Sequence, residues 1–248
     1  MIGRVLLAAL LAGIAAGLVM AAIQHVRLTP MILEAETFEG AGHVHEHAAP
    51  AAVQSGTADA GDAAAVPVHQ HDEAESGWQP ANGWQRTLAT TATAMMAGAA
   101  FAILMAAVSL ISGIGITRRN GLIWGLCGFI AVSLAPAAGL APELPGMPAA
   151  DLAARQIWWL GTIAATGLGL YLIAARREAF ALPVAVVLIA LPHLIGAPMP
   201  ATHESGVPAG LAAAFAANSL VANAVFWALI GFFLSYAMNR FARDAATP

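Results

Sequence analysis

Two short clusters of histidine and acid offer metal-binding chemistry. They are His43-Val44-His45-Glu46-His47 and His69-Gln70-His71-Asp72-Glu73. In an extended chain, residues two apart point the same way, so the histidines of one cluster can converge on one ion. Neutral imidazole beside carboxylate suits zinc, nickel and similar divalent transition ions. The clusters therefore predict metal contact, although a solvated acidic linker that binds nothing specific has the same composition.

Five further candidate ligands stand near prolines or at the ends of apolar stretches: His25, Glu34, Glu36, Glu143 and His193. His193 lies between Pro192 and Pro198, and proline removes a backbone N–H and so frees a carbonyl. Broken backbone at membrane depth is tolerated only where it lines protein or a wet cavity. His193 is therefore a better candidate than a loop histidine, whereas Glu143 is equally well explained as a charge at a helix end.

The residues that most enzyme classes need are missing. All ten basic residues are arginines, so there is no lysine for a Walker A loop or a Schiff base. Cys127 is the only cysteine, which excludes an internal disulfide, a thiolate zinc cluster and an iron–sulfur site. Ten basic against fourteen acidic residues make no cationic face for nucleic acid. We therefore expect a protein that is not an enzyme, binds no nucleic acid and holds no permanently bound cofactor.

The composition is that of a membrane protein. Of 248 residues, 59% are hydrophobic and 10% charged, against about 45–50% and about 25% in soluble domains. A membrane-spanning helix needs about 20 mostly apolar residues. Six stretches approach this length: 5–23, 88–116, 121–140, 157–175, 180–195 and 211–238. The sequence thus predicts an all-α polytopic protein in the lipid bilayer, with six transmembrane helices and an acidic His-rich extracytoplasmic loop.

The arginines orient these helices. With both termini in the cytoplasm, seven arginines fall inside: Arg4, Arg118, Arg119, Arg176, Arg177, Arg240 and Arg243. The other three, Arg27, Arg86 and Arg155, fall outside. This division follows the positive-inside tendency. We therefore expect both termini in the cytoplasm and the His-rich loop on the outer side of the membrane.

The acidic residues define the division of the chain. From Glu34 to Glu75 there are nine acids and no arginine, and few large apolar residues, so this part is expected to be mostly disordered. Residues 1–27 are expected to form the first transmembrane helix, 28–87 the extracytoplasmic loop and 88–248 a five-helix membrane bundle. A cleaved signal peptide is the alternative for the first stretch, but its 5–23 run exceeds the usual apolar core of about 7–15 residues.

Small and polar residues inside the predicted spans have two interpretations. Two glycine pairs are spaced four residues apart, Gly13 with Gly17 and Gly121 with Gly125. This spacing lets helices approach closely, either as ordinary packing or around a pathway. Five polar residues lie in the fourth and sixth stretches: Thr162, Thr166, Asn218, Ser219 and Asn223. They either coordinate a passing ion or hold helices together, and no carboxylate in the middle of a span indicates an energy source.

Five segments carry a resemblance to a known family: 29–36 (TPMILEAE), 139–146 (GLAPELPG), 155–159 (RQIWW), 192–198 (PHLIGAP) and 204–208 (ESGVP). In order and spacing they resemble the CbtA family, predicted cobalt transporter subunits of bacteria, along nearly the whole chain except the acidic insert. The resemblance implies a partner, the small single-span subunit CbtB, and a place in the bacterial inner (cytoplasmic) membrane, with the His-rich loop in the periplasm. It supplies no mechanism, and the individual residues of the insert are not matched.

These observations lead to one main hypothesis and two alternatives. The main hypothesis is a membrane component for uptake of cobalt or a similar divalent ion, with nickel and zinc as other candidates, from the periplasm. The insert would collect the ion, and His25, His193, Glu34, Glu36 and Glu143 would receive it. One alternative is a non-transporting membrane-anchored metal-binding chaperone or sensor. The other is a redox subunit that holds haem through His25 and His193.

Overall fold

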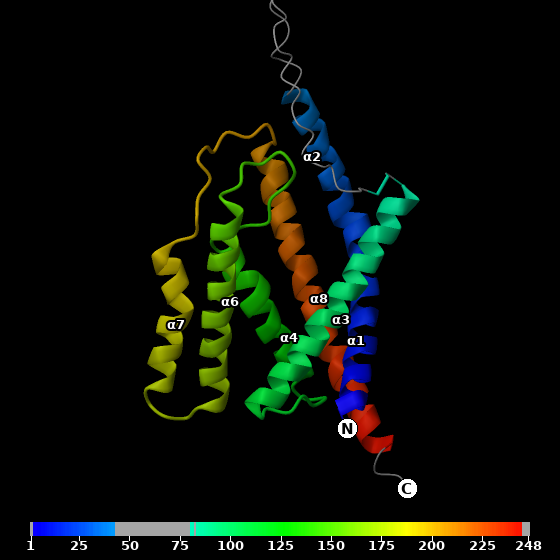
Figure 1. Cartoon of the computed structure of the whole chain (residues 1–248), viewed down its shortest axis with the longest axis vertical. Coiled ribbons are helices and arrows are strands. Elements are labelled where there is room, and N and C mark those ends of the chain that lie inside the picture. Colours follow the sequence, from blue (N-terminus) through cyan, green and yellow to red (C-terminus); the bar gives the residue numbers. More distant parts are fainter. Residues whose placement is uncertain (1, 43–79, 82, 245–248) are drawn as a thin grey trace, which may run out of the picture.

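All regular structure in the described part of the chain is helical. The computed structural model describes residues 2–42, 80, 81 and 83–244. Its helices are α1 (Ile2–Ile23), the π-helical turn η1 (Gln24–Leu28), α2 (Thr29–Gly42), α3 (Trp84–Ser112), α4 (Gly121–Phe129), the π-helical turn η2 (Ile130–Leu134), α5 (Ala135–Ala137), α6 (Leu152–Ala175), α7 (Ala181–Ile195) and α8 (Ala209–Asp244). They form a bundle (Figure 1). The expectation of an all-α protein is confirmed.

The bundle has two ends with different contents. One end, which we name the arginine end, holds the beginning of α1, the end of α8, the α3–α4 turn and the α6–α7 turn (Figure 1). The arginines of these segments include Arg4, the Arg118–Arg119 pair and the Arg176–Arg177 pair. The opposite end, which we name the loop end, holds α2 and the connecting segments 138–151 and 196–208.

Helix length and hydropathy match those of a membrane protein. Four helices are long and apolar enough to cross a bilayer: Ile2–Phe38, Trp84–Ser112, Leu152–Ala175 and Ala209–Arg240. Two shorter apolar helices, Gly121–Ala137 and Ala181–Ile195, stand where the third and fifth spans are expected. The positions of all six expected stretches therefore coincide with apolar helices in the described residues.

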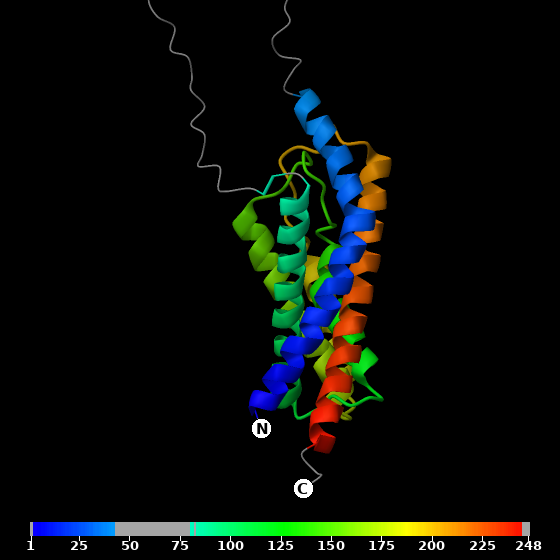
Figure 2. The same ribbon diagram turned by 90° about the vertical axis from the view of Figure 1, so that its right-hand side faces the viewer.

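The first helix does not end at residue 27, where the sequence suggested that a loop begins. It continues as one rod through η1 and α2 to Gly42 (Figure 2). Pro30 has no N–H, and the π-helical turn immediately before it adapts the backbone, with the N–H of Thr29 donating to the carbonyl of Gln24. Leu28 and Ala35 are buried on this extension, so packing stabilises helix where the acidic sequence suggested a loop.

Close backbone contacts hold the main helices together. A Cβ on Gly13 of α1 would overlap the backbone of Gly98 in α3. A Cβ on Gly121 of α4 would likewise meet Ser235 and the backbone of Gly231 in α8. Because lipid provides no hydrophobic drive between helices, such contacts depend on small residues. The glycine pairs therefore act in helix packing, which is one of the two expected roles.

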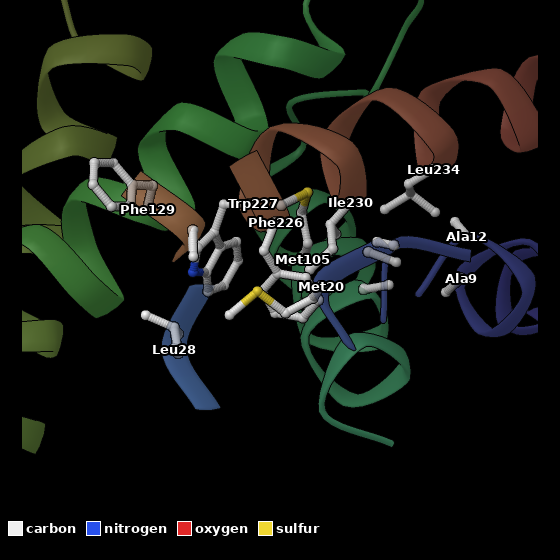
Figure 3. Close-up of a cluster of buried hydrophobic side chains, with 14 of the residues drawn as sticks. Ala9, Ala12, Met20, Leu28, Met105, Phe129, Phe226, Trp227, Ile230 and Leu234 are labelled. Atoms are coloured by element: carbon white, nitrogen blue, oxygen red, sulfur yellow. The ribbon is translucent and has the colours of Figure 1, made fainter. Parts of the chain in front are cut away.

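A hydrophobic cluster joins α1, α3 and α8 at mid-height. Figure 3 shows Met20, Met105, Phe226 and Trp227 gathered there, with Leu234 near the alanines of α1. The ring of Phe101 lies 4.9 Å from that of Trp227, centre to centre. The indole N–H of Trp227 donates to Ser133 Oγ at 3.3 Å. This one indole therefore connects α8 to α3 and η2.

The α6–α7 hairpin is attached at the side of this core. Thr162, Thr166 and Gly169 are buried on α6, and Gly169 lies against Ala185 and Ile189 of α7. Outside the hairpin, α6 packs mainly on η2 and α5 and only slightly on α4. The hairpin is therefore anchored at its loop end more than at its arginine end.

Replacing Gly13 with leucine should separate α1 from α3. The new side chain would overlap the Gly98 and Ala99 backbone, and overpacking typically costs about 1–3 kcal/mol even in more adaptable cores. Thermal unfolding of the detergent-purified protein should therefore occur at a lower temperature. Gly3→Leu is the matched control, since a Cβ there meets nothing within 4 Å. Equal melting of the two variants would show that the glycine contact is dispensable.

Candidate functional site

The segments singled out in the sequence gather at the loop end. Residues 29–36 lie on α2, 139–146 and 204–208 on the connecting segments, 155–159 at the start of α6 and 192–198 at the end of α7 (Figure 1). Leu144, Val207 and Ala35, from three of these segments, are buried in one hydrophobic cluster. Ser205 Oγ also donates to the carbonyl of Gly146 at 3.5 Å. This end is therefore the candidate site.

Two of the predicted acidic ligands are held by arginines. Glu36 Oε1 accepts from Arg86 Nη2 at 2.7 Å, which ties α2 to the start of α3. Glu143 Oε2 accepts from Arg155 Nη2 at 2.9 Å, which ties segment 138–151 to α6. All four side chains are half-buried. A metal ion at either carboxylate would therefore have to share it with a guanidinium or displace that guanidinium.

Trp158 organises the loop end, although its residue type alone indicated no role in a site. Its indole N–H donates to the carbonyl of Pro192 at 3.1 Å. A Cβ on Gly139 would overlap Trp158 and contact Ala197. One indole thus contacts the ends of α5 and α7, and the signal for it was its presence in the 155–159 segment.

His193 lies directly beside this tryptophan. The two rings meet edge to face, 5.9 Å apart and at 74°, and the imidazole side chain is exposed. The carbonyl of Pro192 also accepts from the N–H of Gly196 at 3.1 Å, in addition to the indole. His193 therefore lies on the surface of the loop end in contact with Trp158, and the carbonyl of Pro192 already accepts two hydrogen bonds.

His25 lies in η1, beside a pocket of about 310 Å³. The pocket lies between the first helix and α3, and its polar lining is Thr29, Arg86, Thr87, Thr90 and Thr91. π-Helical turns often mark functional sites. Glu34 is exposed on α2 and does not line this pocket. Among the described residues, His25 is thus a predicted ligand that lines this pocket together with several hydroxyl groups.

The described residues do not bring the predicted ligands into one cluster. Within residues 2–42 and 80–244, Asn82 excepted, no group of three or more His, Cys, Asp or Glu side chains is placed to hold a metal ion. The histidines of the insert, His43, His45, His47, His69 and His71, lie outside the described residues. The ten-residue metal set therefore stays a prediction.

Most polar side chains inside the helices bond to their own backbone. Thr162 Oγ1 donates to the carbonyl of Trp158 at 2.8 Å, and Asn223 Nδ2 donates to that of Ser219 at 2.9 Å. Three buried oxygen atoms have no hydrogen-bond partner within the described part of the chain: Gln24 Oε1, Thr166 Oγ1 and Ser219 Oγ. Of these three residues, Gln24 was not singled out from the sequence.

Comparison with known proteins gives a family for the chain. A family model described as probable cobalt transporter subunit (CbtA) matches residues 2–239. No curated protein and no solved structure matches the chain. The match covers all five segments of the loop end and every described helix except the last turn of α8, so the chain belongs to the CbtA family of probable cobalt transporter subunits.

Proposed function

We propose that this protein is the membrane subunit through which cobalt, or a similar divalent ion such as nickel or zinc, enters from the periplasm. The loop end would receive the ion. The observation that carries this proposal is the gathering of the five segments at that end, in a chain that matches the cobalt transporter subunit family over residues 2–239. No enzymatic step is part of the proposal.

The distribution of arginine supports the direction. Arg4, the Arg118–Arg119 pair and the Arg176–Arg177 pair all belong to the arginine end. The positive-inside tendency makes that end cytoplasmic. The loop end, with Glu34, Glu36 and Glu143, would then face the periplasm of an inner-membrane protein. Two shorter helices would complete a set of six transmembrane helices: the continuous helix formed by α4, η2 and α5, and the separate helix α7.

Imidazole and carboxylate chemistry supports the ligand assignment. His193 beside Trp158 and His25 beside its pocket present neutral nitrogen ligands, which suit divalent cobalt, nickel and zinc. Glu34 is exposed, and Glu36 and Glu143 would bind the ion beside their arginines or in place of them. The insert leaves α2 at Gly42, so its histidines are tethered to the same end. There they would raise the local ion concentration.

The family description calls the chain a subunit, which implies partner subunits. We propose that one partner is a small single-span protein of the CbtB type. It would supply the buried ionisable group that the described residues of this chain lack. The buried polar or charged residues in that part of the chain are Ser109, Thr162, Thr166, Ser219 and Ser235, and none of them is ionisable in the range of a proton-coupled carrier.

The lack of an ionisable residue among the buried polar residues of the described part favours a second candidate function. This function is a membrane-anchored metal-binding chaperone or sensor that does not transport. A carrier driven by protons usually has a carboxylate within its spans. The two functions differ in whether the ion crosses the membrane, so ion accumulation separates them.

The proposed orientation predicts the labelling of two cysteine variants in a Cys127→Ala background. Ala201→Cys lies in the exposed segment 196–208, and Gly115→Cys in the exposed turn after α3. In spheroplasts, an impermeant maleimide should label Ala201→Cys, and should label Gly115→Cys only after permeabilisation. Labelling of Gly115→Cys in intact spheroplasts would overturn the orientation.

His193→Ala should lower uptake of radioactive cobalt at equal membrane abundance. Loss of a metal ligand should weaken ion binding by at least about tenfold, because changes next to a ligand already cost about 10–100-fold. His203→Ala is the matched control, since His203 is also exposed at the loop end, on segment 196–208, but makes no ring contact with Trp158. Parental uptake by both His193→Ala and His193→Gln would make His193 a packing residue.

A further inference from the structure

A second cavity lies near the arginine end and has no part in the proposed ion site. It has a volume of about 360 Å³ and lies between α3, α4 and α6. Its lining is largely apolar, with Val108, Ile123, Trp124 and Leu170 among the contributors. The volume is in the usual range for a small-molecule pocket, about 300–1,000 Å³. The cavity exists because the α6–α7 hairpin is anchored mainly through η2 and α5.

Four arginines adjoin the end of this cavity. Asn120 lines the cavity and directly follows Arg118 and Arg119. Ala174 lines it from the end of α6, two and three residues before Arg176 and Arg177. All four arginine side chains are exposed. A hydrophobic cavity and a group of positive charges therefore share one border.

Two of these arginines have no partner within the described part of the chain. Arg118 stacks on the ring of Tyr236, 4.7 Å from its centre, and Arg176 approaches Glu178 at 3.5 Å. The side chains of Arg119 and Arg177 make no ion pair, hydrogen bond or ring contact with any described residue. Their guanidinium groups are thus available to an external anion.

We propose that the cavity holds an acyl chain of an anionic phospholipid, whose phosphate is bound by Arg119 and Arg177. The apolar lining fits a hydrocarbon chain, and guanidinium binds phosphate oxygens through charge-assisted hydrogen bonds. Basic pockets between transmembrane helices are known to take anionic headgroups. A partner helix would fill the apolar space but would leave the two arginines without an anion. Charge complementarity therefore selects the phospholipid.

The test is native mass spectrometry of the full chain in detergent, titrated with phosphatidylglycerol or with phosphatidylcholine of the same acyl chains. Phosphatidylglycerol should bind more tightly, by up to roughly thirtyfold for two arginines, because the quaternary ammonium of phosphatidylcholine offsets the charge of its phosphate. The Arg119→Gln, Arg177→Gln double variant should lose that preference, whereas Arg27→Gln at the loop end should keep it. Equal binding of the two lipids by the parent protein would overturn the proposal.

A second pair of variants tests the acyl-chain part. Gly167 lines the cavity, and a Cβ there meets nothing within 4 Å, so Gly167→Phe should fill the space without strain and abolish bound phosphatidylglycerol. Gly161→Phe is the control on the same helix, since its Cβ is equally unobstructed and it does not line the cavity. If Gly167→Phe still binds phosphatidylglycerol, the proposal is wrong. It is also wrong if the substitution removes a co-purifying polypeptide instead of the lipid.

Discussion

α1 and α3 touch backbone to backbone at Gly13 and Gly98, and α4 and α8 do so at Gly121 and Gly231. The rest of the molecule depends on these contacts, because helices in lipid associate through packing rather than through a hydrophobic drive. The contacts leave room between helices for the large rings of Phe101, Phe226 and Trp227 at mid-height. They also fix α2 above the core, since α1, η1 and α2 form one rod.

This rigid core positions two ends of opposite chemistry. At the loop end, ion pairs and Trp158 connect segments that are far apart in the sequence. At the arginine end, the hairpin of α6 and α7 leaves a cavity bordered by guanidinium groups. With the two proposed roles, the first end handles a divalent cation and the second binds the lipid that surrounds the protein. The length of the bundle separates the proposed cation ligands from the arginines of the α3–α4 and α6–α7 turns.

Composition and apolar length were enough to predict the helices and their order. They failed at residues 28–42, where the acidic stretch that begins at Glu34 suggested a loop. Burial of Leu28 and Ala35 instead supports helix there, and burial by distant elements is not visible in local sequence. The spacing of Gly13 and Gly17 did predict a close helix contact, because that signal is local.

The candidate site was less predictable, for the same reason. Residue type alone indicated His193 and Glu143 as candidates. It could not show that Trp158 lies against His193, or that Arg155 binds Glu143. These contacts exist only once the chain has folded and brought separate segments together. The cavity near Gly167 was invisible for a further reason: it arises from how the hairpin is anchored, and no motif describes it.

Transport requires that the ion crosses the membrane instead of only binding to the protein. Crossing is tested most directly by radioactive cobalt accumulation in cells that lack other cobalt uptake, with and without this chain and its partner subunit, followed by a wash with an impermeant chelator. If the chain carries the ion inward, accumulation depends on the chain and survives the wash. Cobalt that the chelator removes completely would contradict transport and would identify a binding protein.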